Sequence, residues 1–156
     1  MASRVSPGEG GRRLPRAGEA AAGGALLALP LFAVNLPPST DLPQLIAQVE
    51  LLSQAAEPNL GGERQALRVQ AWHPNKLGYA PILAGWMLAG DGLGAGRWAM
   101  LLVAASWTAA LFAAARWRNR PPGSLALAAL FFYSASWHWG FVNFLMGFPA
   151  FLLAWL

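Results

Sequence analysis

Long stretches without any charged side chain constrain this chain more than any other feature of its sequence. They cover residues 20–36, 77–90, 98–115, 125–136 and 144–156. Charged residues make up only 12% of the chain, about half the fraction of an average soluble domain, and they lie between these apolar runs. Because a charge inside a bilayer is strongly unfavourable, this arrangement predicts an all-α, polytopic membrane protein.

The arginines predict the orientation in the membrane. Several precede the first apolar run, and Arg116, Arg118 and Arg120 lie between two later runs. Since basic residues stay on the cytoplasmic side, we expect the N-terminus inside, with residues 1–19 disordered. A cleaved signal peptide over 20–36 is the alternative, although no clear A-x-A site follows it. No nucleic-acid partner is predicted, because these arginines flank membrane segments and no binding motif accompanies them.

The run at 77–90 decides the topology. As a helix it extends about 21 Å, which is short of a hydrocarbon core about 30 Å thick. If it spanned, the arginine cluster that follows residue 115 would lie outside. We therefore expect 77–90 to lie at the outer interface or to re-enter, and a spanning helix is the alternative. The predicted spans are then about 20–36, 98–115, 125–136 and 144–156, with an outer loop over 37–97.

The final run ends at Leu156 after about 20 Å of helix, and no basic residue closes it. We expect residues 20–156 to form a single transmembrane domain. We also expect the chain to be the front part of a longer protein.

An amphipathic helix is predicted over about 41–55 in the outer loop. Pro37 and Pro38 end the preceding helix, because proline lacks an amide donor. Asp41 and Gln44 have the spacing of a capping box, in which two side chains satisfy free amides at a helix start. Apolar residues then recur on one helical arc, which indicates a helix lying at an interface. These residues are Leu42, Leu45, Ile46, Val49 and Leu52.

Two observations exclude other chemistry. With no cysteine, the chain has no disulfide, no thiolate nucleophile and no Cys-based metal site. The stretch Gly92-Leu93-Gly94-Ala95-Gly96 looks like a dinucleotide-binding loop. No strand precedes it, so we predict a plain loop before the next helix.

The predicted layout is one helix with its N-terminus inside, then a large outer loop that holds an acid, then interfacial helices before the second span. Three short motifs accompany this layout. They are Ser39-Thr40-Asp41-Leu42-Pro43-Gln44, Pro74-Asn75-Lys76-Leu77-Gly78-Tyr79 and Trp139-Gly140-Phe141-Val142-Asn143-Phe144. Layout and motifs resemble the N-terminal part of the GT-C superfamily of integral-membrane glycosyltransferases. The chain is also similar to a group of uncharacterised bacterial polytopic membrane proteins that share D-L-P-Q and G-F-x-N-F-L.

The resemblance implies that Asp41 is the catalytic base of a glycosyltransferase and that the donor is a polyprenyl-phosphate-linked sugar. A carboxylate would take the proton of the acceptor hydroxyl as the sugar–phosphate bond breaks. The alternative role of Asp41 is the helix cap alone. Some members need a divalent metal, but this chain has no second acid beside Asp41 and carries Asn143 where many members have Asp. We therefore predict no cofactor and no metal ligand.

Four further residues are candidates for substrate binding. His73 and Lys76 could hold the phosphate of the donor, or they could be a solvated histidine and a lysine that extends to the interface. His138 lies between two tryptophans and could belong to a sugar-binding platform or to an aromatic belt at the outer surface. Asn143 could bond a substrate or cap the helix that follows it.

Two functions are therefore open. The first is a GT-C-type membrane glycosyltransferase that acts at the outer face of the lipid bilayer. The second is a non-catalytic polytopic membrane protein, either a transporter component or an envelope scaffold. An ion-coupled transporter places ionisable groups inside its spans. The apolar runs of this chain carry almost none, which disfavours ion-coupled transport.

Overall fold

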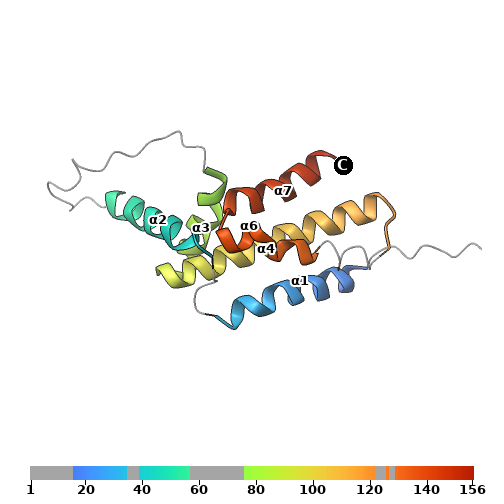
Figure 1. Ribbon diagram of the computed structural model, residues 1–156, viewed down its shortest axis with the longest axis horizontal. Helices are drawn as coiled ribbons and strands as arrows, with labels where there is room; N and C mark the ends of the chain where they lie inside the picture. Colours follow the sequence, from blue (N-terminus) through green and yellow to red (C-terminus); the bar gives the residue numbers. More distant parts are fainter. Residues whose placement is uncertain (1–15, 35–38, 57–75, 122–125, 127–128) are drawn as a thin grey trace, which may run out of the picture.

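The computed structural model describes residues 16–34, 39–56, 76–121, 126 and 129–156, and the regular elements in these ranges are helical (Figure 1). The all-α prediction is confirmed for this part of the chain. The elements are α1 (Ala17–Phe32), α2 (Leu42–Ala56), α3 (Lys76–Ala89), α4 (Gly92–Trp117), the 3-10 turn η2 (Phe131–Tyr133), α6 (Ala135–Trp139) and α7 (Val142–Ala154).

Helix α4 is the axis of the molecule. With 26 residues, it is the one described helix that is long and apolar enough to cross a membrane, whereas α1 and α7 are apolar but shorter. Helices α1, α3 and α7 all pack against α4. In Figure 1, α1, α4 and α7 follow the long direction of the body, while α3 crosses it.

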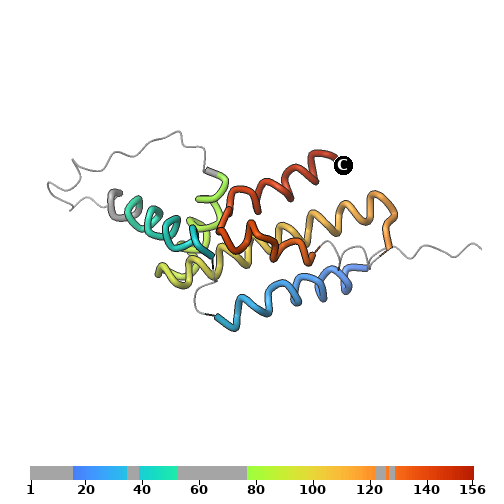
Figure 2. The backbone as a smooth tube through the Cα atoms, in the orientation of Figure 1, coloured from blue at the N-terminus to red at the C-terminus, as the bar shows by residue number. Residues whose placement is uncertain are grey.

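Helix α1 runs opposite to α4, and α7 runs in the same direction as α4. Helices α1 and α4 are antiparallel, because Gly24 of α1 lies against Thr108 in the second half of α4, whereas Arg97 near the start of α4 donates to the Val34 carbonyl oxygen at 3.1 Å. Figure 2 shows α7 running in the same direction as α4, with the last residue near the end at which α4 finishes.

An aromatic cluster joins α4 to the C-terminal part of the chain. The Trp107 indole nitrogen donates to the Leu145 carbonyl oxygen at 2.6 Å, and its ring stacks on Phe148 with centroids 4.3 Å apart. Phe132 packs edge-on against Trp107 and also against Trp137. Trp137 is only 3% exposed. Of the two interpretations of the motif around His138, the outer aromatic belt does not hold for Trp137, because α6 turns its ring into this core.

The loop predicted at Gly92–Gly96 is also wrong, because these residues form the first turns of α4. The Asp91 carboxylate accepts a hydrogen bond from the Gly94 amide at 2.7 Å and so caps the helix start. Small side chains in these turns let α3 approach closely. This packing and the cap together outweigh the low helix propensity of glycine.

The predicted span 125–136 is not one continuous helix in the residues that the structure describes. Residues 129–130 are helical, η2 follows, and Ser134 is extended before α6 begins. Here the chain turns to bring the C-terminal end of α6 toward α2.

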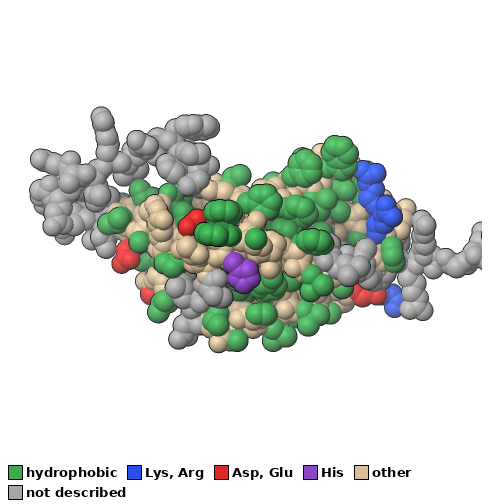
Figure 3. All heavy atoms as spheres, viewed as in Figure 1, with side chains coloured by type: hydrophobic (Ala, Val, Ile, Leu, Met, Phe, Trp, Pro, Cys, Tyr) green, Lys and Arg blue, Asp and Glu red, His purple; other side chains and the backbone are tan. Residues whose placement is uncertain are grey.

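Hydrophobic side chains cover much of the face shown in Figure 3, and arginines gather at one end of the body. The exposed apolar residues include Leu26, Leu29, Met87, Leu102, Phe131, Phe151 and Trp155. Arg16 begins α1, and three more arginines lie at the end of α4, so the antiparallel packing of these two helices places all four at one end. We call it the arginine end; its residues are Arg16, Arg116, Arg118 and Arg120.

Gly85 sets the spacing between α3 and α4. A Cβ atom at this position would lie 2.3 Å from the Ala95 carbonyl oxygen and 2.9 Å from the Ala99 nitrogen. Gly85→Ala is therefore expected to lower the free energy of unfolding by about 1–3 kcal/mol, the usual effect of overpacking. Denaturant unfolding of the purified chain measures this.

Gly23→Ala is the control for Gly85→Ala, because a Cβ at this position of α1 meets open space. It should leave the stability unchanged or raise it by up to about 1 kcal/mol. Equal stability of the Gly85→Ala variant and the wild type would contradict the close contact of α3 with α4.

Candidate functional site

The start of α2 is docked on the end of α6. The backbone amides of Thr40 and Asp41 donate to the carbonyl oxygens of His138 and Trp139 at 3.0 and 3.1 Å, and the Thr40 hydroxyl also donates to His138 at 3.2 Å. Free amides at a helix start and free carbonyls at a helix end both need partners. Here segments about 100 residues apart satisfy each other, which fixes Asp41 beside the α6–α7 turn.

Gly140 makes this contact possible. It ends α6 with a φ of 77°, in the left-handed region that favours glycine. A Cβ atom on it would lie 2.3 Å from the Ser39 hydroxyl oxygen and 2.8 Å from the Asp41 nitrogen. Any side chain at this position would push α2 away from the turn.

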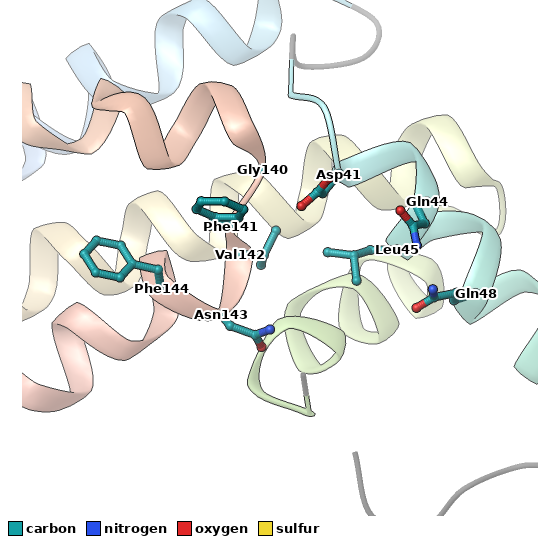
Figure 4. A pocket seen from close by; sticks show the side chains of 9 residues that line it. All are labelled: Asp41, Gln44, Leu45, Gln48, Gly140, Phe141, Val142, Asn143 and Phe144. Atoms are coloured by element: carbon teal, nitrogen blue, oxygen red, sulfur yellow. The ribbon is translucent and has the colours of Figure 1, made fainter. Parts of the chain in front are cut away.

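A pocket of about 460 Å³ lies between α2 and the α6–α7 turn (Figure 4). One wall comes from α2 and carries polar side chains at positions i, i+3 and i+7, which share a helix face. The other wall comes from the turn and the first residues of α7, and it is largely aromatic. The lining residues are Asp41, Gln44, Leu45, Gln48, Gly140, Phe141, Val142, Asn143 and Phe144.

Asp41 occupies the position just before α2, and its carbonyl oxygen accepts the Leu45 amide at 3.0 Å. Within the described ranges its carboxylate accepts no hydrogen bond, so the reciprocal bonds of the predicted capping box with Gln44 are not formed there. The carboxylate instead points across the pocket toward Phe141 (Figure 4). It is half-buried and available to a ligand.

The apolar arc predicted for α2 anchors this wall. Leu42, Leu45, Ile46 and Val49 are buried, as the periodicity indicated, whereas Leu52 is exposed. These buried residues anchor α2 on the body; Leu45 also reaches the pocket, beside the polar side chains of Asp41, Gln44 and Gln48.

Asn143 does not cap α7, because that helix begins one residue earlier, at Val142. Its side-chain oxygen accepts a hydrogen bond from the amide of Gly78, the third residue of α3. Asn143 therefore caps the start of α3 rather than of α7, and it also lines the pocket.

Gln48 was not singled out from the sequence. The hydroxyl of Tyr79 on α3 donates to its side-chain oxygen, which joins α2 to α3 at the edge of the pocket. The signal was present in the i, i+3, i+7 spacing of Asp41, Gln44 and Gln48. The bond to Tyr79 depends on tertiary structure and has no local signature.

Of the other predicted site residues, only His138 has a side chain that the structure describes. His73 lies outside the described residues, and Lys76 is described only as the first residue of α3. The His138 side chain is exposed and does not line the pocket; its carbonyl oxygen holds α2. In the described ranges no group of three or more His, Asp or Glu residues could hold a metal ion.

Comparisons of the chain with protein-family models, with curated proteins and with solved structures gave no match. The chemistry of the pocket follows from its own groups. A carboxylate can accept a proton or a hydrogen bond, amides can donate and accept, and phenyl rings can pack on apolar faces of a ligand. This combination suits a ligand that carries hydroxyl groups.

The docking of α2 is expected to fail when Gly140 gains a side chain. Gly140→Ala combines a left-handed backbone, unfavourable by about 1–2 kcal/mol for alanine, with the clash against the Asp41 nitrogen. Its expected result is a loss of at least about 2 kcal/mol in the free energy of unfolding. Thermal unfolding of the purified chain gives the measurement.

Gly147→Ala is the matched control for Gly140→Ala, since it lies within α7 and a Cβ there meets nothing within 4 Å. This variant should be as stable as the wild type or slightly more stable. If both variants unfold together with the wild type, the α6–α7 turn does not hold α2 as described.

Proposed function

We propose that this chain is a polytopic protein of a bacterial cytoplasmic membrane, with its N-terminus inside and the pocket toward the outer face. The exposed apolar side chains of the body and the length of α4 support this proposal. Further support comes from the arginine end, because basic residues stay on the cytoplasmic side. The pocket is built where α2, α6 and α7 meet, away from these arginines (Figures 1 and 4).

Single-cysteine labelling tests the orientation, because the natural chain has no cysteine. Ala47 on α2 and Arg118 at the end of α4 are both exposed. In intact spheroplasts a membrane-impermeant maleimide should label Ala47→Cys but not Arg118→Cys, and disruption of the membrane should make Arg118→Cys reactive. The cysteine-free chain controls for background. Labelling of both variants from the same side would refute the proposed topology.

The activity that we propose is transfer of a sugar from a polyprenyl-phosphate-linked donor to a hydroxyl group, with Asp41 as general base. The observation that carries this proposal is the Asp41 carboxylate. It lines a pocket, and no hydrogen bond from the described residues occupies it. A carboxylate used only as a helix cap would be bonded to the amides of its own helix.

In the proposed transfer step one bond forms at the anomeric carbon as another breaks. The acceptor oxygen attacks the anomeric carbon and forms the new glycosidic bond, while the bond from this carbon to the phosphate oxygen breaks. Asp41 takes the proton of the acceptor hydroxyl, and polyprenyl phosphate leaves with the bonding electrons. Lys76 remains a proposed partner for the phosphate. It is the first residue of α3, two residues before Gly78, whose amide donates a hydrogen bond to the pocket residue Asn143.

Asp41→Asn is expected to lower sugar transfer at least about 100-fold, because amides do not act as general bases. Membranes containing equal amounts of each protein are assayed with a panel of radiolabelled polyprenyl-phosphate sugars. Asp91→Asn is the matched control: it makes the same change at the start of α4, where asparagine caps as well as aspartate.

Retention of full transfer by the Asp41→Asn variant would move the chemistry away from this carboxylate. Absence of transfer by the wild type with every donor would favour the alternative, a non-catalytic transporter component or envelope scaffold.

A further inference from the structure

The side chain of Gln48 lines the pocket in an orientation that is set by another helix, α3. It lies on α2 seven residues after Asp41, on the same face, and lines the pocket with a half-buried side chain (Figure 4). A glutamine amide on a solvated face rotates freely between its two orientations. Gln48 is held in one of them by α3.

Tyr79 fixes that orientation. Its hydroxyl donates to the side-chain oxygen of Gln48, so this oxygen faces α3. The amide nitrogen, with two N–H donors, then forms the other end of the group. It has no hydrogen-bond partner among the residues that the structure describes. One wall of the pocket thus presents a group that only accepts, the Asp41 carboxylate, and a group that only donates, the Gln48 nitrogen.

We propose that Gln48, oriented by Tyr79, is a specificity-determining residue that donates a hydrogen bond to an uncharged sugar bound in this pocket. This inference deepens the proposed function and rests on it. A sugar hydroxyl donates and accepts at once. Asp41 and Gln48 are two helical turns apart, about 10 Å along α2, so hydroxyls on opposite sides of one ring, rather than adjacent ones, satisfy them.

The opposite wall favours the same class of ligand. Phe141 and Phe144 are 49% and 59% exposed, so their rings offer apolar faces to the C–H groups of a sugar ring. Asp41 is the only ionisable side chain among the described residues that line the pocket. Its negative charge disfavours a phosphate in the same space. The pocket therefore takes the uncharged, hydroxyl-bearing part of the substrate.

Gln48→Glu tests this assignment, because it keeps an oxygen that accepts the Tyr79 hydrogen bond and removes both N–H donors. The probes are methyl glycosides of glucose, mannose and galactose, with glucose 1-phosphate as the charged comparison. Binding to the full chain in nanodiscs is titrated by saturation-transfer difference NMR. The wild type is expected to bind at least one methyl glycoside more tightly than glucose 1-phosphate, and Gln48→Glu to weaken that binding about tenfold.

Two further variants separate recognition from structure. Ala47→Glu adds the same negative charge on the exposed side of α2 and should bind the glycoside like the wild type. Tyr79→Phe releases the amide and should weaken binding about threefold, less than Gln48→Glu. Equal melting temperatures of Gln48→Glu and the wild type exclude a purely structural effect.

Binding is measured without transfer, so the two proposals fail separately. Weakened binding by Gln48→Glu supports the inference even if no transfer is found with any donor. Glycoside binding by Gln48→Glu equal to that of the wild type overturns it, even if Asp41→Asn abolishes transfer. Preference of the wild type for glucose 1-phosphate, or no binding of any glycoside, also overturns it.

Discussion

The pocket depends on one contact, in which the first amides of the α2 segment meet the last carbonyls of α6. Both sets of groups lack partners within their own helices, and leaving them unpaired in an apolar body would be costly. Their union removes both costs with two backbone hydrogen bonds. It also determines where Asp41 lies. The backbone amide of Asp41 donates one of these two bonds, and its side chain is the carboxylate of the pocket. Gly140 is the condition for this contact, since any larger residue would separate the two helix ends.

This contact explains why a residue at a helix start keeps a free carboxylate. A capping side chain is useful when the first amides of a helix have no other partner. In α2 the amides just before the helix are taken by α6, and Pro43, the second helical residue, has no amide to satisfy. The demand for a cap is therefore small. The Asp41 carboxylate faces the pocket instead of its own helix, which is the arrangement that a catalytic or binding group requires.

The sequence predicted the elements better than their partners. The apolar arc of α2 and the helical character of the long apolar runs follow from periodicity and composition, which are local properties. Asn143 was recognised as polar and well placed, but its bond to Gly78 joins segments that are distant in the chain. For the same reason the sequence around His138 does not show that Trp137 lies in the core, where the break at Ser134 turns it. The helical start of α4 was missed because glycines suggest a loop until their close packing against α3 is known.

Helix α3 links the scaffold to the chemistry. Through Gly78 it holds Asn143 on one wall of the pocket, and through Tyr79 it holds Gln48 on the other. Its own position is set by the contact of Gly85 with α4, the longest of the described helices. A displacement of α3 would therefore move a group on each wall at once, whereas the backbone of Asp41 is held by α6. The carboxylate and the donors that accompany it are thus positioned by different helices, so the relative placement of α3 and α6 determines which ligands can meet both.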